Sequence, residues 1–467
     1  MPPLEPPLPK LQALWHLTNT AGSAPGRFIA DSAGLGVLGE LLSCGTIAAP
    51  LARFRGKSLL VWCKRQRTVV ETLLQLDGIA ARLVLCPSDF DAAHLAPVIA
   101  EAAIDAIVTD STALAEQARD AKPVVFIENE ARYALDPSED RSRATEWVLF
   151  TSGTSDRPKL VAHTLSSLTG PVGDFHGKAQ GAVWSSFYDI RRYGGMQILL
   201  RALIGGASLV LSQAGEPVAA FLDRAGACGV THISGTPSHW RRALMSGAAD
   251  RFAPRYVRLS GEIADQAILD HLAAAFPRAS IAHAFASTEA GLAFEVDDGR
   301  AGFPAAIVDG EGAKAELRIV DGSLRIRSPR TASRYLGERG ALKDADGFVD
   351  TGDMLELRDG RYYFVGRREG VINVGGQKVH PEEVEAVINR LPNIRMARVR
   401  SQRNPITGAL VVADIVLADA ATNFDAVKSD IMAACRAALP AHKVPAMLRA
   451  VPALDVGASG KLSRRHA

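Results

Sequence analysis

The chain has few cysteines, no long apolar run and no large excess of charge of either sign. Its five cysteines are scattered among 467 residues, and none of them forms a C-x-x-C pair. They are Cys44, Cys63, Cys86, Cys228 and Cys435. This pattern predicts reduced thiols in a cytoplasmic protein rather than a disulfide framework or a zinc site. The formal net charge of +2 gives no electrostatic preference for nucleic acid or for an anionic membrane.

Targeting and membrane signals are also missing from the sequence. Residues 1–7 are rich in proline and have neither the basic nor the apolar region of a signal peptide. The longest apolar candidate, residues 409–421, is interrupted by Asp414 and Asp419, so we expect no membrane span. Apolar residues make up 47% and charged residues 22%, which is ordinary for a globular protein. Because 467 residues exceed what one hydrophobic core usually holds, we expect at least two domains.

The first part of the chain alternates short apolar runs with an amphipathic stretch. The pattern predicts strands at residues 58–62, 81–85 and 106–109, and a helix at residues 68–76. Such alternation is typical of an α/β layer with parallel strands. A second α/β unit is expected over residues 147–295.

The pattern changes after residue 303. Residues 316–320 and 323–327 flank Asp321-Gly322, a strong hairpin signal, and predict a small β subdomain over residues 303–365. Beyond Gly366 the pattern becomes α+β, with a helix expected to begin at Pro381. The predicted fold class is therefore α/β. It comprises a large N-terminal domain of α/β sheet layers plus the small β subdomain (residues 1–367) and a small mobile α+β C-terminal domain (residues 368–467).

A glycine-rich segment at residues 34–39 matches the G-x-G-x-x-G pattern of dinucleotide-binding proteins. The strand candidate before it, residues 28–30, is short, and no acidic residue for a ribose stands about twenty residues on. We therefore expect a glycine-rich turn before a helix. An NAD-binding dehydrogenase remains a distant alternative.

Hydroxyls, a glycine and a lysine are concentrated directly after the apolar run at residues 147–150. The segment reads Thr151, Ser152, Gly153, Thr154, Ser155, Asp156, Arg157, Pro158 and Lys159. A strand that ends in such a loop offers backbone N–H groups, hydroxyls and a cation to a polyphosphate. It is not a Walker A loop, because proline precedes the lysine and leucine follows it. Taken alone, the segment also fits a hydroxyl-rich surface turn.

Further motifs follow in an order that resembles the adenylate-forming superfamily of acyl-CoA synthetases, adenylation domains of peptide synthetases and luciferases. They are Phe285-Ala286-Ser287-Thr288-Glu289, Asp350-Thr351-Gly352-Asp353, Gly366-Arg367, Gly375-Gly376 and Gly460-Lys461. The resemblance covers about residues 147–465, and the order of the motifs is more specific than any one of them. It implies an ATP-dependent, AMP-forming ligase. Such an enzyme activates a carboxylic acid as an acyl or aryl adenylate and transfers it to the thiol of CoA, releasing AMP and pyrophosphate.

The resemblance implies catalytic roles for three residues. Lys159 and the loop from Thr151 to Ser155 would bind the β- and γ-phosphates of ATP. Glu289 would be a ligand of Mg²⁺, which prefers hard oxygen donors. Lys461 would bridge the carboxylate and the α-phosphate during adenylation, a task that suits a point charge on a long stem.

The remaining motifs would bind the nucleotide and the pantetheine. Phe285, with Ala286, Ser287 and Thr288, would lie at the adenine, although a lone phenylalanine is more often a core residue. Asp353 would accept hydrogen bonds from the ribose hydroxyls, aimed by a turn at Thr351-Gly352. Arg367 would donate near the ribose and phosphate. Gly375 and Gly376 would line the pantetheine tunnel, or form only a tight turn.

Several positions depart from the family pattern. Asp156 and Leu160 stand where glycine is usual, and Asp156 places an anion beside the phosphate site. Leu165 replaces a frequent histidine, with His163 two residues earlier. Residues 187–195 only loosely resemble the aromatic/His motif beside the acyl pocket, because they contain aspartate and arginine.

The acceptor of the acyl group leaves alternatives open. The resemblance places a hinge at Glu369, where aspartate or lysine is usual, and implies that the small domain rotates between two half-reactions. CoA is the expected acceptor, and the pantetheine thiol of a carrier protein is the first alternative. A degenerate nucleotide-binding homologue without ligase activity is the second, motivated by Asp156 and residues 188–193. Neither the acid nor the oligomeric state is predicted.

Overall fold

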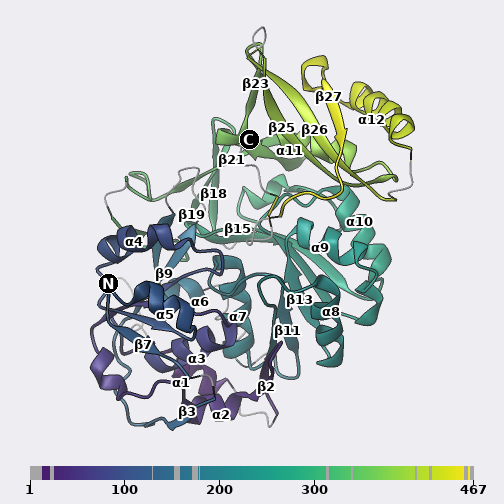
Figure 1. Ribbon diagram of the computed structural model, residues 1–467. Helices are drawn as coiled ribbons and strands as arrows, with labels where there is room; N and C mark the ends of the chain where they lie inside the picture. The colour runs from purple at the N-terminus through teal and green to yellow at the C-terminus, as the bar shows by residue number, and fades with distance from the viewer. Residues whose placement is uncertain are drawn as a thin grey trace, which may run out of the picture. The chain divides into compact units, whose positions relative to one another are not determined.

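The computed structural model describes most of the chain as mixed α/β structure (Figure 1). The described residues are 13–21, 26–128, 130–151, 158–170, 177, 179–311, 315–337, 340–404, 408–419, 423–456 and 461–462. Contacts divide the chain into two compact units. Unit 1 contains Met1–Pro217, Arg224–His232 and Pro329–Leu342, and unit 2 contains Val218–Asp223, Ile233–Ser328 and Lys343–Ala467. The predicted α/β class with a small α+β region at the C-terminus is confirmed. The domain boundary at residues 367/368 stays a prediction.

Unit 1 is built on a seven-stranded sheet with the order β20-β10-β9-β5-β4-β6-β7. Its strands are β4 (Ser58–Val61), β5 (Arg82–Leu85), β6 (Ala106–Thr109), β7 (Val124–Phe126), β9 (Glu146–Thr151), β10 (Lys159–Thr164) and β20 (Arg334–Tyr335). Strands β9, β5, β4, β6 and β7 are mutually parallel, as the alternating pattern predicts. Strand β4 is buried at every position, which is usual for a parallel strand covered on both faces.

The helices between these strands are α3 (Gln66–Leu76), α4 (Leu95–Glu101) and α5 (Thr112–Ala118). Helix α3 confirms the helix expected at residues 68–76. The core of this layer joins Leu60, Val84 and Ile107 of the sheet to Leu95 and Val98 of α4. Strand β9 is therefore held in a rigid layer, and the polar segment after it begins at a fixed place.

A second set of strands in unit 1 has the order β11-β12-β1-β2. The elements here are α1 (Leu14–Thr20), β1 (Phe28–Asp31), β2 (Gly34–Val37), α2 (Leu38–Ser43), β3 (Cys44–Gly45), β8 (Tyr133–Ala134), α6 (Leu165–Thr169), β11 (Val183–Ser186), α7 (Tyr193–Gly205) and β12 (Ser208–Leu211). Helix α8 (Val218–Ala227) follows. The prediction of a turn at residues 34–39 was wrong. Gly34–Val37 forms β2, which pairs antiparallel with β1, and only the helix after it, α2, was predicted. A dinucleotide-binding fingerprint lies in a turn between a strand of a parallel sheet and the helix that follows it. The β1–β2 hairpin is antiparallel and does not have this arrangement.

Unit 2 contains strands in the order β16-β15-β14-β13 and a separate five-stranded sheet in the order β17-β22-β21-β19-β18. The elements are β13 (His232–Gly235), α9 (Pro237–Met245), β14 (Tyr256–Ser260), α10 (Gln266–Ala275), β15 (Ser280–Ser287), β16 (Gly291–Val296), β17 (Phe303–Pro304), β18 (Glu316–Val320), β19 (Ser323–Arg327), β21 (Val349–Arg358) and β22 (Arg361–Arg367). The five-stranded sheet confirms the predicted β subdomain. Its β18–β19 hairpin turns at Asp321 (φ 51°) and Gly322 (φ 75°), and two positive φ values are what a type I′ turn requires.

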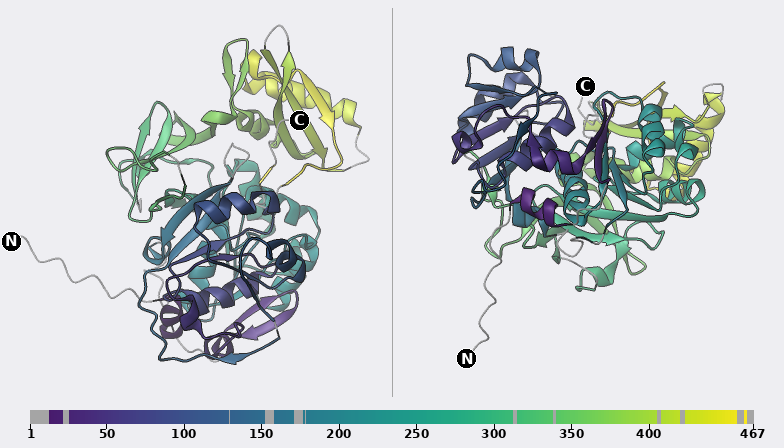
Figure 2. Two further views of the ribbon diagram at one scale, coloured as in Figure 1. Left: turned by 60° about the vertical axis from the view of Figure 1, so that its left-hand side comes forward. Right: turned by 90° about the horizontal axis from the view of Figure 1, so that it is seen from below.

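The C-terminal part of unit 2 is α+β. Its elements are β23 (Ile372–Val374), β24 (Gln377–Val379), α11 (Pro381–Ile388), β25 (Ile394–Asn404), β26 (Gly408–Leu417), α12 (Phe424–Ala438) and β27 (Met447–Ala450). Val427 and Ile431 of α12 pack with Val399 and Ile415 of the β25–β26 pair. Two further views show this sheet and its helices (Figure 2). Helix α11 begins at Pro381 with two glutamates in its first turn, as the sequence predicts.

Candidate active site

The hydroxyl-rich segment connects two paired strands of unit 1. Thr151 ends β9, Lys159 begins β10, and the two residues face each other across the antiparallel ladder. The Nζ of Lys159 lies 5.8 Å from the ring centroid of Tyr335, a cation–π distance. Five residues predicted to bind phosphate or to perturb it lie outside the described residues. They are Ser152, Gly153, Thr154, Ser155 and Asp156. The phosphate-binding roles of this segment therefore stay predictions.

In unit 2, Glu289 lies in the turn that joins β15 to β16. The ladder between these strands has a bulge at Phe285/Ala286, immediately before the turn. A bulge re-aims the side chains beside it, and bulges are common next to active sites. The Oγ of Ser287 accepts a hydrogen bond from the backbone N–H of Ala290 at 3.0 Å, which closes the turn around Glu289.

Phe285 belongs to an aromatic cluster. Its ring is nearly parallel to the ring of Phe364, with centroids 4.8 Å apart, and lies 5.9 Å from that of Phe294. Phe294 and the fully buried Phe303 form the inner part of the cluster. Phe285 itself is only partly buried. Phe285 therefore lies at the edge of the hydrophobic core. Its contact with adenine stays a prediction.

Asp353 and Arg367 are paired on neighbouring strands. They face each other across the β21–β22 ladder, and a bulge follows at Met354/Leu355. The Nε of Arg367 donates to the Oδ1 of Asp353 at 3.1 Å, and 58% of the arginine side chain is exposed. Burial lowers the pKa of Arg367, but the carboxylates of Asp353, Glu289 and Glu369 raise it more. The predicted metal ligand, ribose acceptor and arginine thus lie close enough to interact electrostatically.

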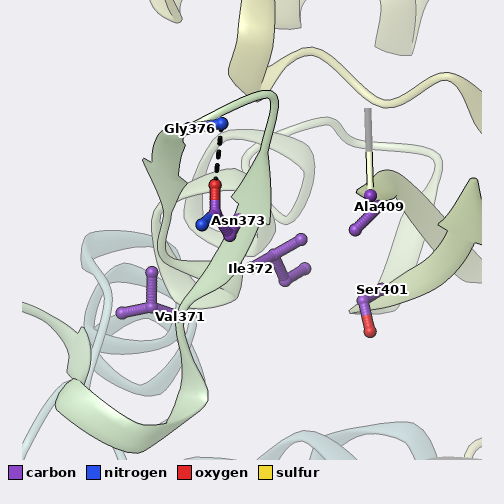
Figure 3. A pocket seen from close by; sticks show the side chains of 7 residues that line it. Val371, Ile372, Asn373, Gly376, Ser401 and Ala409 are labelled. Carbon is purple, nitrogen blue, oxygen red and sulfur yellow. Dashed lines mark hydrogen bonds between the residues drawn. The ribbon is translucent and has the colours of Figure 1, made fainter. Parts of the chain in front are cut away.

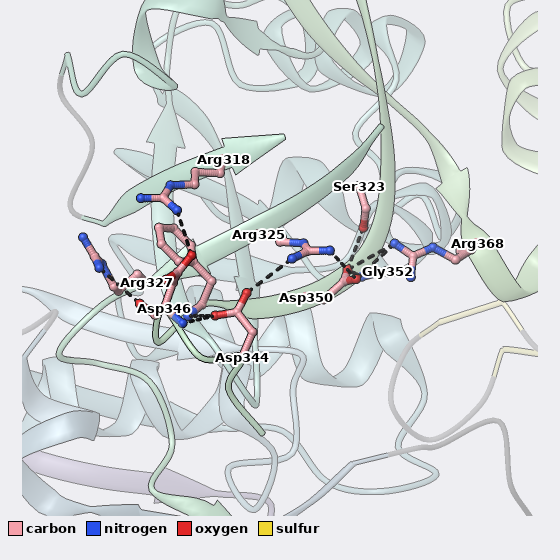
Figure 4. A network of polar contacts seen from close by, with 10 residues as sticks. Arg318, Ser323, Arg325, Arg327, Asp344, Asp346, Asp350, Gly352 and Arg368 are labelled. Carbon is pink, nitrogen blue, oxygen red and sulfur yellow. Dashed lines mark hydrogen bonds and ion pairs between the residues drawn. The ribbon is translucent and has the colours of Figure 1, made fainter. Parts of the chain in front are cut away.

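Asp350 lies in β21, three residues before Asp353, and makes the polar contacts that Figure 4 shows. Its Oδ1 accepts hydrogen bonds from the Ser323 hydroxyl at 2.7 Å and from the Gly352 N–H at 3.0 Å. Its Oδ2 lies 3.1 Å from Arg368. Burial raises the pKa of Asp350, but these bonds lower it on balance. The prediction of a turn at Thr351-Gly352 was wrong: both residues lie within β21, at a point where its register with β19 shifts and where Gly352 has φ 70°.

Two residues of unit 2 that the sequence analysis did not single out, Gly261 and Glu262, lie beside the segment Lys461-Leu462 (the Lys461 segment). A Cβ placed on Gly261 would lie 3.4 Å from the Cε of Lys461. The Oε1 of Glu262 accepts a hydrogen bond from the backbone N–H of Leu462 at 2.9 Å. Both residues follow directly after the mostly buried strand β14. A Gly-Glu pair at the end of a buried strand was the signal in the sequence that could have marked them as candidate site residues.

Gly375 and Gly376 form the two-residue turn of the β23–β24 hairpin, with φ values of 57° and 86°. Asn373 accepts the N–H of Gly376 at 2.9 Å. The turn borders an open pocket of about 430 Å³, lined also by Ile372, Ser401 and Ala409 (Figure 3). The two glycines therefore form a tight turn, and their contact with pantetheine stays a prediction. The hinge candidate Glu369 lies in a short 3₁₀ helix, Arg368–Gly370.

The residues that depart from the family pattern in unit 1 have structural partners. Arg191 is 1% exposed, and its Nε donates to the Oδ1 of Asp189 at 2.7 Å. Arg191 also donates to the carbonyl of Cys63, and Asp189 accepts the N–H of Ser88. The buried His163 contacts the Ser167 hydroxyl at 3.1 Å. These contacts join distant parts of the fold and give the charges of Asp189 and Arg191 a structural role.

No group of three or more His, Cys, Asp or Glu side chains in the described ranges is arranged to hold a metal ion. Among the helices described, none combines the length and apolar character needed to cross a bilayer. All five cysteines are free thiols.

The profile of AMP-binding enzymes matches residues 47–336, and the profile of the AMP-binding enzyme C-terminal domain matches residues 383–461. A 2-succinylbenzoate–CoA ligase from Bacillus velezensis is 27% identical over 422 residues, which are 85% of this chain and 79% of that protein.

Solved structures share the fold. An anthranilate CoA ligase in complex with anthranoyl-AMP aligns with a TM-score of 0.83 at 17% identity, covering 97% of this chain and 96% of that one. An amide bond synthetase from Marinactinospora thermotolerans aligns with a TM-score of 0.77 at 20% identity, covering 97% and 98%. The chain therefore belongs to the AMP-binding enzyme family and is, as its motifs predict, an AMP-forming acid–thiol ligase that works through an acyl adenylate.

Proposed function

We propose that this ligase converts an aryl carboxylic acid to its CoA thioester in the cytoplasm. The nucleotide site rests on one observation: Asp353 and Arg367 are hydrogen-bonded at 3.1 Å, and Glu289 lies within electrostatic reach of that arginine. The choice of CoA and of an aryl acid is supported by the 2-succinylbenzoate–CoA ligases among the relatives. The cytoplasmic location is supported by five free thiols.

In the first half-reaction, a carboxylate oxygen of the acid attacks the α-phosphorus of ATP. The bond from that phosphorus to the β-phosphate bridging oxygen breaks, which gives the acyl adenylate and pyrophosphate. Negative charge grows on the phosphates during this step, so cations fixed near them stabilise the transition state. Lys461 supplies such a charge at the α-phosphate, and Lys159 with the Thr151–Ser155 segment binds the β- and γ-phosphates.

The nucleotide is held by residues of β15, β21 and β22. Asp353 accepts hydrogen bonds from the two ribose hydroxyls, and the exposed guanidinium of Arg367 donates beside them. The edge of the aromatic cluster at Phe285, with the following Ala286, Ser287 and Thr288, borders the adenine.

Mg²⁺ fits the donor set of this site. Glu289 offers one carboxylate, and Mg²⁺ commonly uses one or two protein carboxylates together with phosphate oxygens of the substrate. When bound, the ion neutralises charge on the phosphates. The closed turn between Ser287 and Ala290 holds Glu289 in place for this role.

In the second half-reaction the thiol sulfur of CoA attacks the acyl carbon, the bond to the AMP oxygen breaks, and the thiol proton is lost to solvent or a base. The Gly375-Gly376 turn has no side chain to obstruct a pantetheine arm near the pocket of Figure 3.

The test is a panel of carboxylates, including benzoate and 2-succinylbenzoate, assayed by pyrophosphate release with and without CoA. We expect an aryl acid to give ATP-dependent pyrophosphate release and, with CoA, a thioester identified by mass spectrometry. A thioester formed only on an added phosphopantetheinyl carrier protein would replace CoA as the acceptor. Pyrophosphate release with aliphatic acids alone would overturn the proposed acid class.

A further inference from the structure

We infer that Glu262 is a positioning residue that holds the Lys461 segment in place for adenylation; the inference rests on the proposed role of Lys461. The carboxylate of Glu262 joins α9 to Leu462, which is 200 residues away from Glu262 in sequence. Its Oε2 accepts the backbone N–H of Ser238 at 2.9 Å, and its Oε1 accepts the backbone N–H of Leu462 at 2.9 Å.

One oxygen of Glu262 is committed to the first turn of α9. The first N–H groups of a helix have no partner within it and must find one elsewhere. In α9 the first residue, Pro237, has no N–H, and the Thr236 side chain accepts the N–H of His239 at 3.0 Å. The N–H of Ser238 between them is the one that Glu262 accepts. This bond restricts the glutamate side chain, so its second oxygen is presented in a fixed direction.

The second oxygen binds the backbone immediately after the lysine. Leu462 also forms an antiparallel bridge with Val456. The stem of Lys461 lies over Gly261, within 3.4 Å of where a Cβ would stand. Gly261 has φ +86°, which favours glycine. The hydrogen bond from Leu462 to Glu262 therefore holds the backbone directly beside Lys461, from which the lysine side chain extends.

A charged acceptor makes a stronger hydrogen bond than a neutral one. Loss of this bond should leave Lys461 present but poorly placed, and poor placement of a group that acts only in the transition state lowers kcat rather than substrate binding. Glu262→Gln keeps the length of the side chain but has a single acceptor oxygen for two N–H donors. We expect it to lower the rate of pyrophosphate release about 10- to 100-fold with little change in the KM for ATP.

Two pairs of variants separate positioning from stability. Leu462→Pro removes the backbone N–H on the other side of the bond and also restricts the backbone at residues 461 and 462, whereas Leu462→Ala retains the N–H and serves as the matched control. Asp265→Asn is the control for Glu262, because Asp265 caps α10 through the N–H of Ile268 at 3.0 Å and pairs with Arg241. We expect Glu262→Gln and Leu462→Pro to be equally impaired, and the double variant to be no worse than either alone.

Each variant is measured in both half-reactions, together with Lys461→Ala. If Glu262 positions the lysine, Glu262→Gln should slow adenylation and leave thioester formation from pre-made acyl adenylate unchanged. Amide hydrogen exchange at Leu462, which does not depend on activity, should be faster in Glu262→Gln than in the wild type.

The outcomes are distinguishable. If Lys461→Ala slows adenylation but Glu262→Gln changes neither that rate nor the exchange at Leu462, the inference about Glu262 is wrong and the role of Lys461 stands. If Lys461→Ala affects both half-reactions equally, the proposed role of the lysine fails, and the exchange experiment still decides whether Glu262 holds this segment. Equal loss in both half-reactions for Glu262→Gln, with a lower melting temperature, would reduce Glu262 to a helix cap.

Discussion

Arg367 and Asp353 face each other across the β21–β22 ladder, and the Nε of the arginine donates to the Oδ1 of the aspartate at 3.1 Å. Only one oxygen of the aspartate is used in this bond, and 17% of the aspartate side chain is exposed. The arginine therefore orients the carboxylate through one of its two oxygens. A bulge at Met354/Leu355 follows directly and fixes the direction of the pair.

Asp353→Ala should raise the KM for ATP, because the ribose loses a charged acceptor. A loss of about 1.5–3 kcal/mol, roughly 10- to 100-fold, is expected for such a group. Initial rates over a range of ATP concentrations measure it. Asp346→Ala is the control, since Asp346 lies in the turn before β21 and its side chain is 71% exposed. A folded Asp353→Ala variant with the wild-type dependence on ATP would remove Asp353 from the site.

Lys461→Ala should separate the two half-reactions. Adenylation should fall by several hundred-fold or more, on the order of 3–4 kcal/mol, because the charge that it removes acts while the adenylate forms. Thioester formation from pre-made acyl adenylate should change much less. Lys428→Ala, an exposed lysine of α12, is the control. Equal losses in both steps would contradict this role.

Glu369→Pro tests the hinge. In this structure Glu369 lies in the 3₁₀ helix Arg368–Gly370, and a 3₁₀ residue has a φ that proline can adopt. Proline should preserve this conformation and hinder any other, so adenylation should persist while thioester formation falls sharply. Glu369→Ala, which leaves the backbone free, is the control. Thioester formation at the wild-type rate in Glu369→Pro would place the pivot elsewhere.

The elements that the sequence predicted share a local signal. Apolar runs of four or five residues became β4, β5 and β6 because a buried parallel strand needs no alternation. Asp321-Gly322 predicted a hairpin because aspartate and glycine are among the residues that most readily adopt the positive φ values of such a turn. The β2 strand was missed because its pairing with β1 overrode the turn preference of its glycines.

The missed site residues depend on contacts between distant segments. Nothing near Glu262 in the sequence indicates Leu462, 200 residues away. Asp189 and Arg191 looked unusual for an acyl pocket because their partners, Ser88 and Cys63, are brought to them only by folding. The order of the motifs was enough to predict the family. The hydrogen bonds between distant segments could be identified only in the structure.

Asp189→Asn should strongly destabilise the fold. Burial raises the pKa of Asp189, but Arg191 lowers it on balance, so both groups are charged inside the protein. Removing one partner of a buried pair leaves the other charge uncompensated, at a cost of about 3–5 kcal/mol. Denaturant unfolding measures the change. Asp223→Asn breaks an exposed pair with Arg251, where each side chain is about half exposed, and should change stability much less because solvent screens the pair. Similar effects of the two substitutions would show that the Asp189–Arg191 pair contributes little.

His239→Gln should make the protein less sensitive to acid. Burial, and then the nearby charge of Arg242, lower the pKa of His239 to about 3. Its Nδ1 accepts the backbone N–H of Thr236 at 3.2 Å, so protonation there would break the cap of α9. Above pH 6.5 the histidine is neutral in both the folded and unfolded states and has no effect on pH dependence.

Between pH 6.5 and about 3 the unfolded state binds a proton that the folded state does not, so the free energy of unfolding falls as the pH falls. The slope is about 1.4 kcal/mol per pH unit for one group. Glutamine at the third position of a helix can accept the same N–H without titrating. Unfolding curves at pH 7.5 and 4.5 should therefore differ less for His239→Gln than for the wild type, whereas the exposed His271→Gln control should keep the wild-type difference. If His239→Gln loses as much stability on acidification as the wild type, the cap of α9 does not depend on a neutral histidine.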